Sequence, residues 1–174
     1  MARACLGASA ALVAACLACA LPADADPRPA EVGRVIGGDA RLVGQAPYRV
    51  LVWSVFDAAL WSGSGAFAWE RPFALTLTYR RAFSAEALAD RTVEEMTRRG
   101  YAEAAALRPR LVQCFADVAP GDRITGVAES ASRARFFHNG AERCTLERRG
   151  FSRAFFGIWL EDQGAFSERL RGAR

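Results

Sequence analysis

Hydrophobic and polar residues alternate in two distinct ways in the middle of the chain. From Phe73 to Tyr79, apolar residues alternate with small or hydroxyl residues, which predicts a half-buried strand. From Ser84 to Arg99 the period is helical, because apolar side chains fall on one stripe and charged ones lie away from it. Ser84 is a favourable N-cap and Gly100 is placed to end this helix. Charged pairs four residues apart, Glu94–Arg98 and Glu95–Arg99, are expected to support it.

The run from Tyr48 to Trp61 is rich in β-branched and aromatic residues and predicts the longest strand, buried at the centre of a sheet. Residues 26–31 are expected to form a loose N-terminus. The other expected elements are a strand pair or bent strand over Val32–Val43, a helix over Ala102–Ala116 that contains Pro109, a strand over Arg123–Glu129, a hairpin of Arg133–His138 and Ala141–Leu146 around Asn139-Gly140, a helix over Ser152–Leu160 and a short helix near Phe166–Leu170. Helices grouped between two blocks of antiparallel strands predict an α+β fold.

The first 25 residues have the pattern of a secretory signal peptide. A short basic start precedes an uncharged stretch from Ala4 to Leu21, and Ala23-Asp24-Ala25 offers a small-x-small cleavage site. Residues 26–174 are then one mature domain, periplasmic or secreted, without an integral membrane span. Two alternatives stay open: cleavage near Ala18-Cys19-Ala20, and a lipobox that would make Cys16 an acylated first residue. A retained anchor is disfavoured, because this stretch is only weakly hydrophobic.

Signal cleavage would leave only Cys114 and Cys144 among the five cysteines. In an oxidising compartment two such thiols can pair. The sequence leaves two alternatives open, one disulfide or two buried thiols, because it does not give the distance between the Cα atoms. Cys16-x-x-Cys19 has the spacing of a redox pair, but it lies inside the predicted targeting segment, where the structural context of such a pair is missing.

Composition excludes several function classes. With 52% hydrophobic residues and a net charge of +4, the chain is not expected to be disordered. All 23 basic residues are arginine and no recognition motif accompanies them, so no nucleic-acid partner is predicted. His138 is the only histidine, which rules out a multi-histidine metal site, and its place beside a hairpin turn predicts a surface residue. No cofactor is expected. Asp57 and Asp117 are expected to make structural ion pairs.

Five strings carry a family resemblance in their order along the chain. They are VWSVFDAALW (Val52–Trp61), FALTLTYRRAFSAEALADRTVEEM (Phe73–Met96), PGDRITGV (Pro120–Val127), ARFFHNG (Ala134–Gly140) and AFFGIWL (Ala154–Leu160). Together they resemble the exported bacterial branch of the chalcone isomerase-like family. The resemblance implies an open-faced β-sandwich, in which a large antiparallel sheet has helices packed on one face and an apolar ligand lies between them. The family includes plant chalcone isomerases, which are intramolecular lyases, and non-catalytic members similar to fatty-acid-binding proteins.

Carrying the family's polar residues onto this sequence argues against chalcone chemistry. The position of the catalytic threonine falls near Leu51, that of the tyrosine near Leu88 and that of the asparagine near Glu95. Because leucine has no hydroxyl to polarise a carbonyl, no catalytic residue is predicted. Arg41 and Arg49 both lie near the position of the family's arginine.

The favoured function is a non-catalytic binder of a small amphipathic ligand, such as a fatty acid. Arg49 is the candidate anion-binding group, since its guanidinium can hold a carboxylate with two hydrogen bonds. The candidate wall residues are Phe56, Leu88, Phe137 and Trp159. The alternatives are an intramolecular lyase or isomerase acting on an unknown substrate, and a structural or interaction domain whose cavity is filled. The sequence does not determine the ligand or the oligomeric state.

Overall fold

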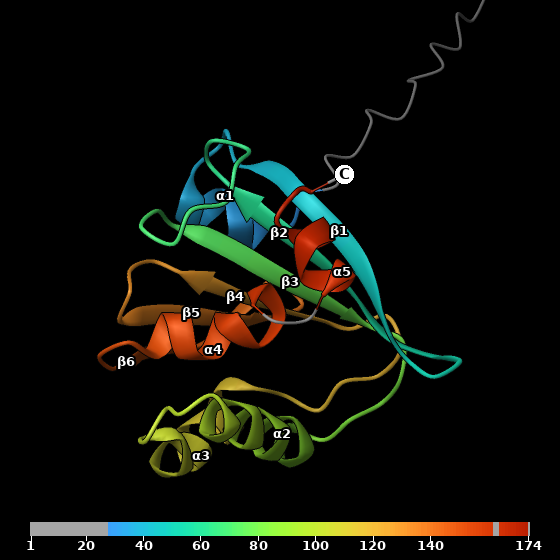
Figure 1. The fold of residues 1–174 in the computed structure, drawn as a ribbon, viewed down its shortest axis with the longest axis vertical. Coiled ribbons are helices and arrows are strands. Elements are labelled where there is room, and N and C mark those ends of the chain that lie inside the picture. The colour runs from blue at the N-terminus through green and yellow to red at the C-terminus, as the bar shows by residue number, and fades with distance from the viewer. Residues whose placement is uncertain (1–27, 162–163, 174) are drawn as a thin grey trace, which may run out of the picture.

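Six antiparallel strands form one sheet in which each strand pairs with its neighbour in the chain (Figure 1). The strands are β1 (Arg41–Val50), β2 (Trp53–Ser62), β3 (Phe73–Tyr79), β4 (Arg123–Ala128), β5 (Arg133–His138) and β6 (Ala141–Glu147). The helices are α1 (Ala30–Ile36), α2 (Ala85–Arg98), α3 (Ala104–Cys114), α4 (Phe151–Leu160) and α5 (Ala165–Leu170). This computed structural model describes residues 28–161 and 164–173, so the predicted signal peptide and Cys16 lie outside the described residues.

Helices α2 to α5 lie on one side of the sheet and α1 lies on the other. Strand β3 shows how the sequence builds both sides. Phe73, Leu75, Leu77 and Tyr79 point into the main core beneath the helices, and Ala74 points into a smaller core beneath α1. Successive side chains of a strand point to opposite faces, so the alternation places large residues on one face and small ones on the other. The predicted α+β open sheet is confirmed, with α1 as an added element.

Helix α2 begins and ends as its sequence predicts. The Ser84 hydroxyl accepts a hydrogen bond from the Ala87 N–H at 3.1 Å, and Gly100 follows the helix with a positive φ of 82°. The Asp117 carboxylate accepts a second N–H of this first turn, that of Ala85, at 2.9 Å. Asp117 therefore stabilises the start of α2 and, within residues 28–161 and 164–173, does not form the ion pair that the sequence suggested, whereas Asp57 does pair with Arg80.

Two predicted elements are wrong. The run from Tyr48 to Trp61 is not one strand, because the chain reverses at Leu51 and Val52 and so divides it between β1 and β2. Neither residue gives a turn signal. Val32–Val43 is not a strand pair, because Ala30–Ile36 is helical and β1 starts only at Arg41. Within the segment predicted to be a loose N-terminus, Glu31 belongs to α1 and is fully buried.

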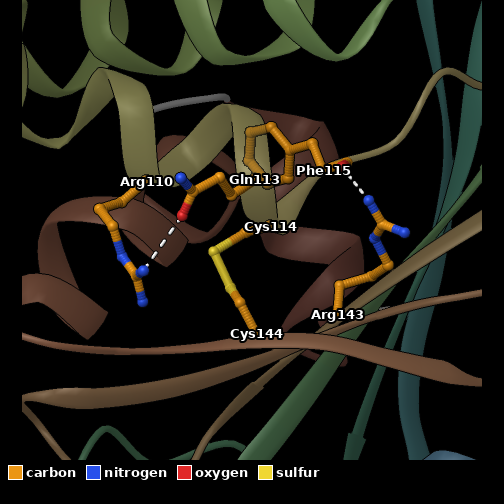
Figure 2. The surroundings of a disulfide bond; sticks show 6 residues. All are labelled: Arg110, Gln113, Cys114, Phe115, Arg143 and Cys144. Atoms are coloured by element: carbon orange, nitrogen blue, oxygen red, sulfur yellow. Dashed lines mark hydrogen bonds between the residues drawn. A yellow bond between two sulfur atoms is a disulfide. The ribbon is translucent and has the colours of Figure 1, made fainter.

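Cys114 and Cys144 form a disulfide that joins the end of α3 to β6 (Figure 2). Their Cα atoms are 5.0 Å apart, and the bridge closes a loop with a sequence separation of 30. Beside it, the Arg143 guanidinium donates to the carbonyl oxygen of Phe115 at 3.4 Å, a second link between the same two segments. Of the two alternatives that the sequence left open, the structure has the disulfide. It fixes the α2–α3 pair relative to the sheet.

Helix α5 packs closely against β1, and a glycine in β1 makes this close contact possible. At Gly44 the pairing of β1 with β2 shifts register, and an added Cβ would overlap the carbonyl oxygens of Arg169 and Leu170. Only glycine permits this approach. The packing brings Phe166 onto Tyr48 and Phe56, with ring centroids at 5.3 and 6.3 Å. β1 is an edge strand, which explains why Pro47 is tolerated within it.

Candidate functional site: an apolar cavity between sheet and helices

A cavity of about 710 Å³ lies on the side of the sheet that helices α2 and α4 cover. This volume is within the range of small-molecule sites, roughly 300–1,000 Å³. Side chains that line it come from the strands (Tyr48, Val50, Trp53, Val55, Phe56, Leu77, Tyr79, Ile124), from the segment after β3 (Arg81, Ala82, Phe83), from α2 (Ala87, Leu88, Arg91, Thr92, Glu95) and from α3–α4 (Phe115, Phe155, Ile158, Trp159). Most of these are apolar, so the cavity favours hydrocarbon over water.

Aromatic rings form much of its wall. Tyr48 stacks on Phe56 with centroids 4.9 Å apart and planes 8° apart, and Phe56 meets Tyr79 edge to face at 6.1 Å. On the helical side, Phe155 and Trp159 of α4 are 5.1 Å apart. These pairs hold one another in place, because edge-to-face and offset stacked rings are favourable arrangements. The wall is therefore preformed and does not require a ligand to assemble it.

The polar groups that α2 contributes are already occupied by one another. Glu95 is buried and pairs with Arg91 at 2.5 Å and also with Arg98. Arg91 contacts Glu94 as well, at 2.7 Å, and this hydrogen bond raises the pKa of the Arg91 guanidinium above its usual value. The Thr92 hydroxyl donates to the carbonyl oxygen of Leu88 at 2.8 Å. A ligand group would have to displace a partner to bind the Glu95 carboxylate or to accept the hydroxyl proton of Thr92.

Tyr79 brings a hydroxyl to the cavity at the end of β3. Its side chain is 5% exposed, and burial raises the pKa of the phenol well above its usual value of 10. The hydroxyl is therefore protonated throughout the physiological pH range and can donate a hydrogen bond to a ligand oxygen.

Arg81 supplies a cation at the cavity that no carboxylate of the described residues neutralises. Its guanidinium lies over the Trp53 ring, 5.0 Å from the centroid, and this stacking holds the charge beside the apolar wall. Arg81 also lines a shallow surface groove together with Arg49, Arg80 and Asp57, where Arg80 is paired with Asp57. Arg81 is thus placed where the apolar interior meets the surface.

Three of the five predicted ligand-binding residues, Phe56, Leu88 and Trp159, line this cavity together. The structure does not bring the other two there. Arg49 is exposed on β1 and lines only shallow surface grooves. Phe137 is buried in the smaller core on the opposite face, beneath the Arg34 guanidinium, because it follows the inward-facing Phe136 by one residue.

Leu51 does not occupy the position that the family resemblance gave it. It lies in the turn between β1 and β2, and its side chain is 91% exposed. It is therefore not part of a cavity wall. Leu88 and Glu95, the other two transferred positions, do line the cavity. Sequence reasoning missed Tyr79 and Arg81. The alternation of β3 could have found Tyr79, because this residue shares the face of Phe73 and Leu77.

A family model described as chalcone isomerase-like matches residues 64–173. The chain belongs to the chalcone isomerase-like family. Among solved structures, a fatty-acid binding protein of Arabidopsis thaliana is similar in fold, with a TM-score of 0.64 and 9% sequence identity over 79% of this chain and 88% of that one. A search of curated protein sequences gives no match. The predicted family and fold are therefore confirmed.

Other chemistry is sparse in the part of the chain that the structure describes. His138 lies at the end of β5, 3.9 Å from Asp122 and beside the turn at Asn139. No group of three or more potential metal ligands occurs in residues 28–161 and 164–173. None of the helices in this part of the chain has the length and apolar character needed to cross a bilayer.

Proposed function

We propose that this member of the family binds a small amphipathic ligand with an anionic head, such as a fatty acid, without converting it. The observation that carries the proposal is the preformed apolar cavity of about 710 Å³ with an unneutralised arginine, Arg81, at its opening. A hydrocarbon chain would lie against Phe56, Leu88 and Trp159, and Arg81 would hold a carboxylate. The similarity in fold to a plant fatty-acid binding protein supports this choice of ligand.

The open cavity argues against the alternative of a domain filled by its own side chains. The pairing of Glu95 with Arg91 and the hydrogen bond from the Thr92 hydroxyl to the Leu88 carbonyl oxygen argue against catalysis, because groups engaged in this way are not poised to act on a substrate. Arg81 is not buried, so its charge suits reversible capture of an anion at the surface.

The direct test is to purify residues 26–174, extract them with organic solvent and identify any bound acid by mass spectrometry. The delipidated protein is then titrated with a fluorescent fatty acid. Leu88→Trp, which fills the cavity, is expected to weaken binding more than tenfold. Arg81→Ala is expected to weaken it about tenfold, because one charge-assisted hydrogen-bonded pair is lost. Unchanged affinity in both variants would exclude this cavity as the site.

Two further arginine variants make the test selective. Arg49→Ala examines the residue that the sequence favoured, and a smaller effect than that of Arg81→Ala is expected, because Arg49 does not line the cavity. Arg110→Ala on α3 is the matched control, since this exposed arginine hydrogen-bonds to Gln113, does not line the cavity and should leave affinity unchanged when replaced. Equal losses in all three variants would point to nonspecific attraction of the anion.

An isomerase is the second candidate, and the Tyr79 hydroxyl is the observation in its favour. A protonated phenol inside an apolar cavity can polarise a carbonyl. The assay is turnover of naringenin chalcone against its spontaneous cyclisation. No acceleration is expected. A measurable kcat that disappears in Tyr79→Phe would establish the enzyme reading instead.

We also propose that the chain is exported, as its first 25 residues predict. The Cys114–Cys144 disulfide supports this, since such bonds persist in oxidising compartments. The intact mass of the product from periplasm decides between cleavage after Ala25 and a diacylglyceryl group on Cys16.

A further inference from the structure

The turn between β1 and β2 concentrates exposed hydrophobic side chains. Val50, Leu51, Val52 and Trp53 are 51%, 91%, 84% and 58% exposed, and the only other large hydrophobic residue so exposed in the described chain is Leu42. Figure 1 shows this hairpin extending past the end of the sheet. We propose that its tip docks on an anionic lipid bilayer, with Leu51 and Val52 entering the hydrocarbon boundary.

The chemistry of the turn is unfavourable unless the tip has such a role. Two-residue hairpin turns favour glycine, asparagine and aspartate, and the turn between β5 and β6 uses Asn139-Gly140. Leu51 instead adopts a positive φ of 55°, which a bulky side chain rarely does. No packing offsets this strain, because the side chain projects into solvent. Strain together with exposed apolar surface at one point is characteristic of a functional contact.

The charges around the tip select an anionic partner. Arg49 and Arg81 flank it, and neither pairs with a carboxylate of the described residues. Trp53 lies between the apolar tip and these charges, with the Arg81 guanidinium over its ring. Aliphatic residues at the tip, then tryptophan, then arginine match the order of hydrocarbon, interface and anionic headgroup in a membrane.

The shape of the surface favours a bilayer over a protein partner. A protein interface that is stable buries about 1,000 Å² or more with good complementarity, which four residues on a convex tip do not supply. A bilayer needs no complementary surface, since it closes around whatever enters it.

Docking by the tip would also present the cavity to the membrane, because Val50 and Trp53 contribute to the lining as well. This last consequence rests on the proposed function: a lipid-like ligand could pass between bilayer and cavity without crossing water. The docking itself requires only the tip and its charges.

The test uses residues 26–174 and flotation with vesicles of phosphatidylcholine alone or with one quarter phosphatidylglycerol. The wild-type protein is expected to float with the anionic vesicles and much less with the neutral ones. The double variant Leu51→Asn, Val52→Gly places asparagine, which tolerates a positive φ, at position 51 and a flexible glycine after it, so the fold is expected to be retained. Its partitioning is expected to fall at least tenfold, with an equal or higher Tm.

Two controls sharpen the result. Leu42→Asn removes the other exposed hydrophobic residue, at the far end of β1, and is expected to bind vesicles like the wild type. Arg49→Gln is expected to reduce binding to anionic vesicles about threefold and to leave binding to neutral ones unchanged. Loss of the same size in Leu42→Asn as in the double variant would contradict a specific role of the tip.

Three outcomes overturn the proposal: a wild-type protein that floats with neither vesicle, a double variant that binds as the wild type does, and a dimer in solution that the double variant abolishes. The last would identify the tip as a contact between copies. Titration with the fluorescent fatty acid in the absence of vesicles separates this proposal from the cavity, because Leu51 and Val52 do not line it. Intact fatty-acid binding with lost flotation supports docking alone.

Discussion

The two faces of the sheet are built from the same strands, yet they bury different chemistry. Beneath α2 to α5 lie large apolar side chains, aromatic pairs and the cavity. Beneath α1, Thr76 and Thr125 lie side by side on β3 and β4, and the Thr125 hydroxyl donates to the Glu31 carboxylate at 2.8 Å. Arg123 completes this network with two hydrogen bonds to Glu31. The face beneath α2 to α5 leaves room for a ligand, whereas the polar groups beneath α1 hydrogen-bond to one another.

This difference indicates how a ligand cavity is kept open. Bulky rings that brace one another leave an apolar space between them, whereas the hollow on the opposite face is lined in large part by small and polar residues such as Ala59, Thr76 and Arg123. A buried carboxylate is tolerated only where every hydrogen bond is satisfied, and α1 brings Glu31 to such a place. The polar network thus fixes the sheet from behind without adding charge to the cavity.

Substitution of two adjacent phenylalanines tests the comparison most strongly. Phe136→Ala is expected to lower the free energy of unfolding by about 4 kcal/mol, since the ring contacts Phe115, Phe151 and Phe155 in the main core. Phe137→Ala should cost about 3 kcal/mol, because the smaller core surrounds it less extensively. Urea denaturation measures both. Fatty-acid affinity should survive Phe137→Ala; its loss would contradict the assignment of Phe137 to the ligand-free face.

Removal of the disulfide is expected to give the second largest loss of stability, on the side of the sheet that α2 to α5 cover. A bridge across a separation of 30 residues lowers the conformational entropy of the unfolded chain, which stabilises the folded state by roughly 3–4 kcal/mol. The variant Cys114→Ser, Cys144→Ser should show this loss in urea denaturation. Reduction of the wild-type protein should reproduce it, and reduction of the double variant, as the control, should change nothing. A much smaller loss would mean that α3 stays docked on β6 without the bond.

Acid should weaken the opposite face through Glu31. Burial alone would raise the pKa of Glu31, but its backbone hydrogen bond and those from Arg123 and Thr125 outweigh burial and hold the pKa below its usual value of 4.5. The unfolded chain therefore takes up this proton at a higher pH than the folded one. The stabilisation is fully present above about pH 4.5 and is lost as pH falls through the lowered pKa.

Glu31→Gln makes this prediction measurable. The variant is expected to lose about 2 kcal/mol at pH 7, because the half-buried Arg123 loses its charged partner. Its stability should also fall less steeply between pH 5 and pH 3 than that of the wild type, a range around the usual glutamate pKa of 4.5. Glu86→Gln, on the exposed side of α2, is the matched control. Parallel pH profiles of stability for Glu31→Gln and wild type would contradict the assignment of the acid sensitivity to Glu31.

The smallest effect is expected at Thr76. Its hydroxyl lies 3.3 Å from that of Thr125, which also bonds to Glu31. Thr76→Val keeps the shape and removes one neutral hydrogen bond, so a loss of about 0.5–1 kcal/mol is expected in urea denaturation. A larger effect would show that the whole network depends on this outer member.

The sequence predicted elements where local signals and tertiary packing agree. The alternation of β3, the Ser84 cap and the Asn139-Gly140 turn are each confirmed, because one local pattern determines each. The predicted charge pairs on α2, Glu94–Arg98 and Glu95–Arg99, are wrong. Among the described residues Arg91 and Arg98 pair with Glu95, while Arg99 reaches across to the carbonyl oxygen of Glu161 at 2.8 Å. Sequence spacing does not report partners on another helix.

The candidate site was predicted in part for a similar reason. Phe56, Leu88 and Trp159 lie in elements whose inward face is set by their own periodicity. Arg49 and Leu51 were misplaced because the turn that splits β1 from β2 is apolar and carries no glycine, asparagine or proline. Because the turn lies at Leu51 and Val52, Arg49 belongs to the exposed edge strand, and Arg81 is the cation at the cavity.

The neighbour-to-neighbour order of the strands has a consequence for assembly. Hairpins between successive strands close over short stretches of chain, and only the β3–β4 pairing must wait for residues 80–122 to be accommodated. The thiols of Cys114 and Cys144 meet only when α3 reaches β6 across that excursion. The disulfide is therefore expected to form late, in a domain that is already nearly folded. An oxidant should then raise the stability of the folded protein without changing its folding rate.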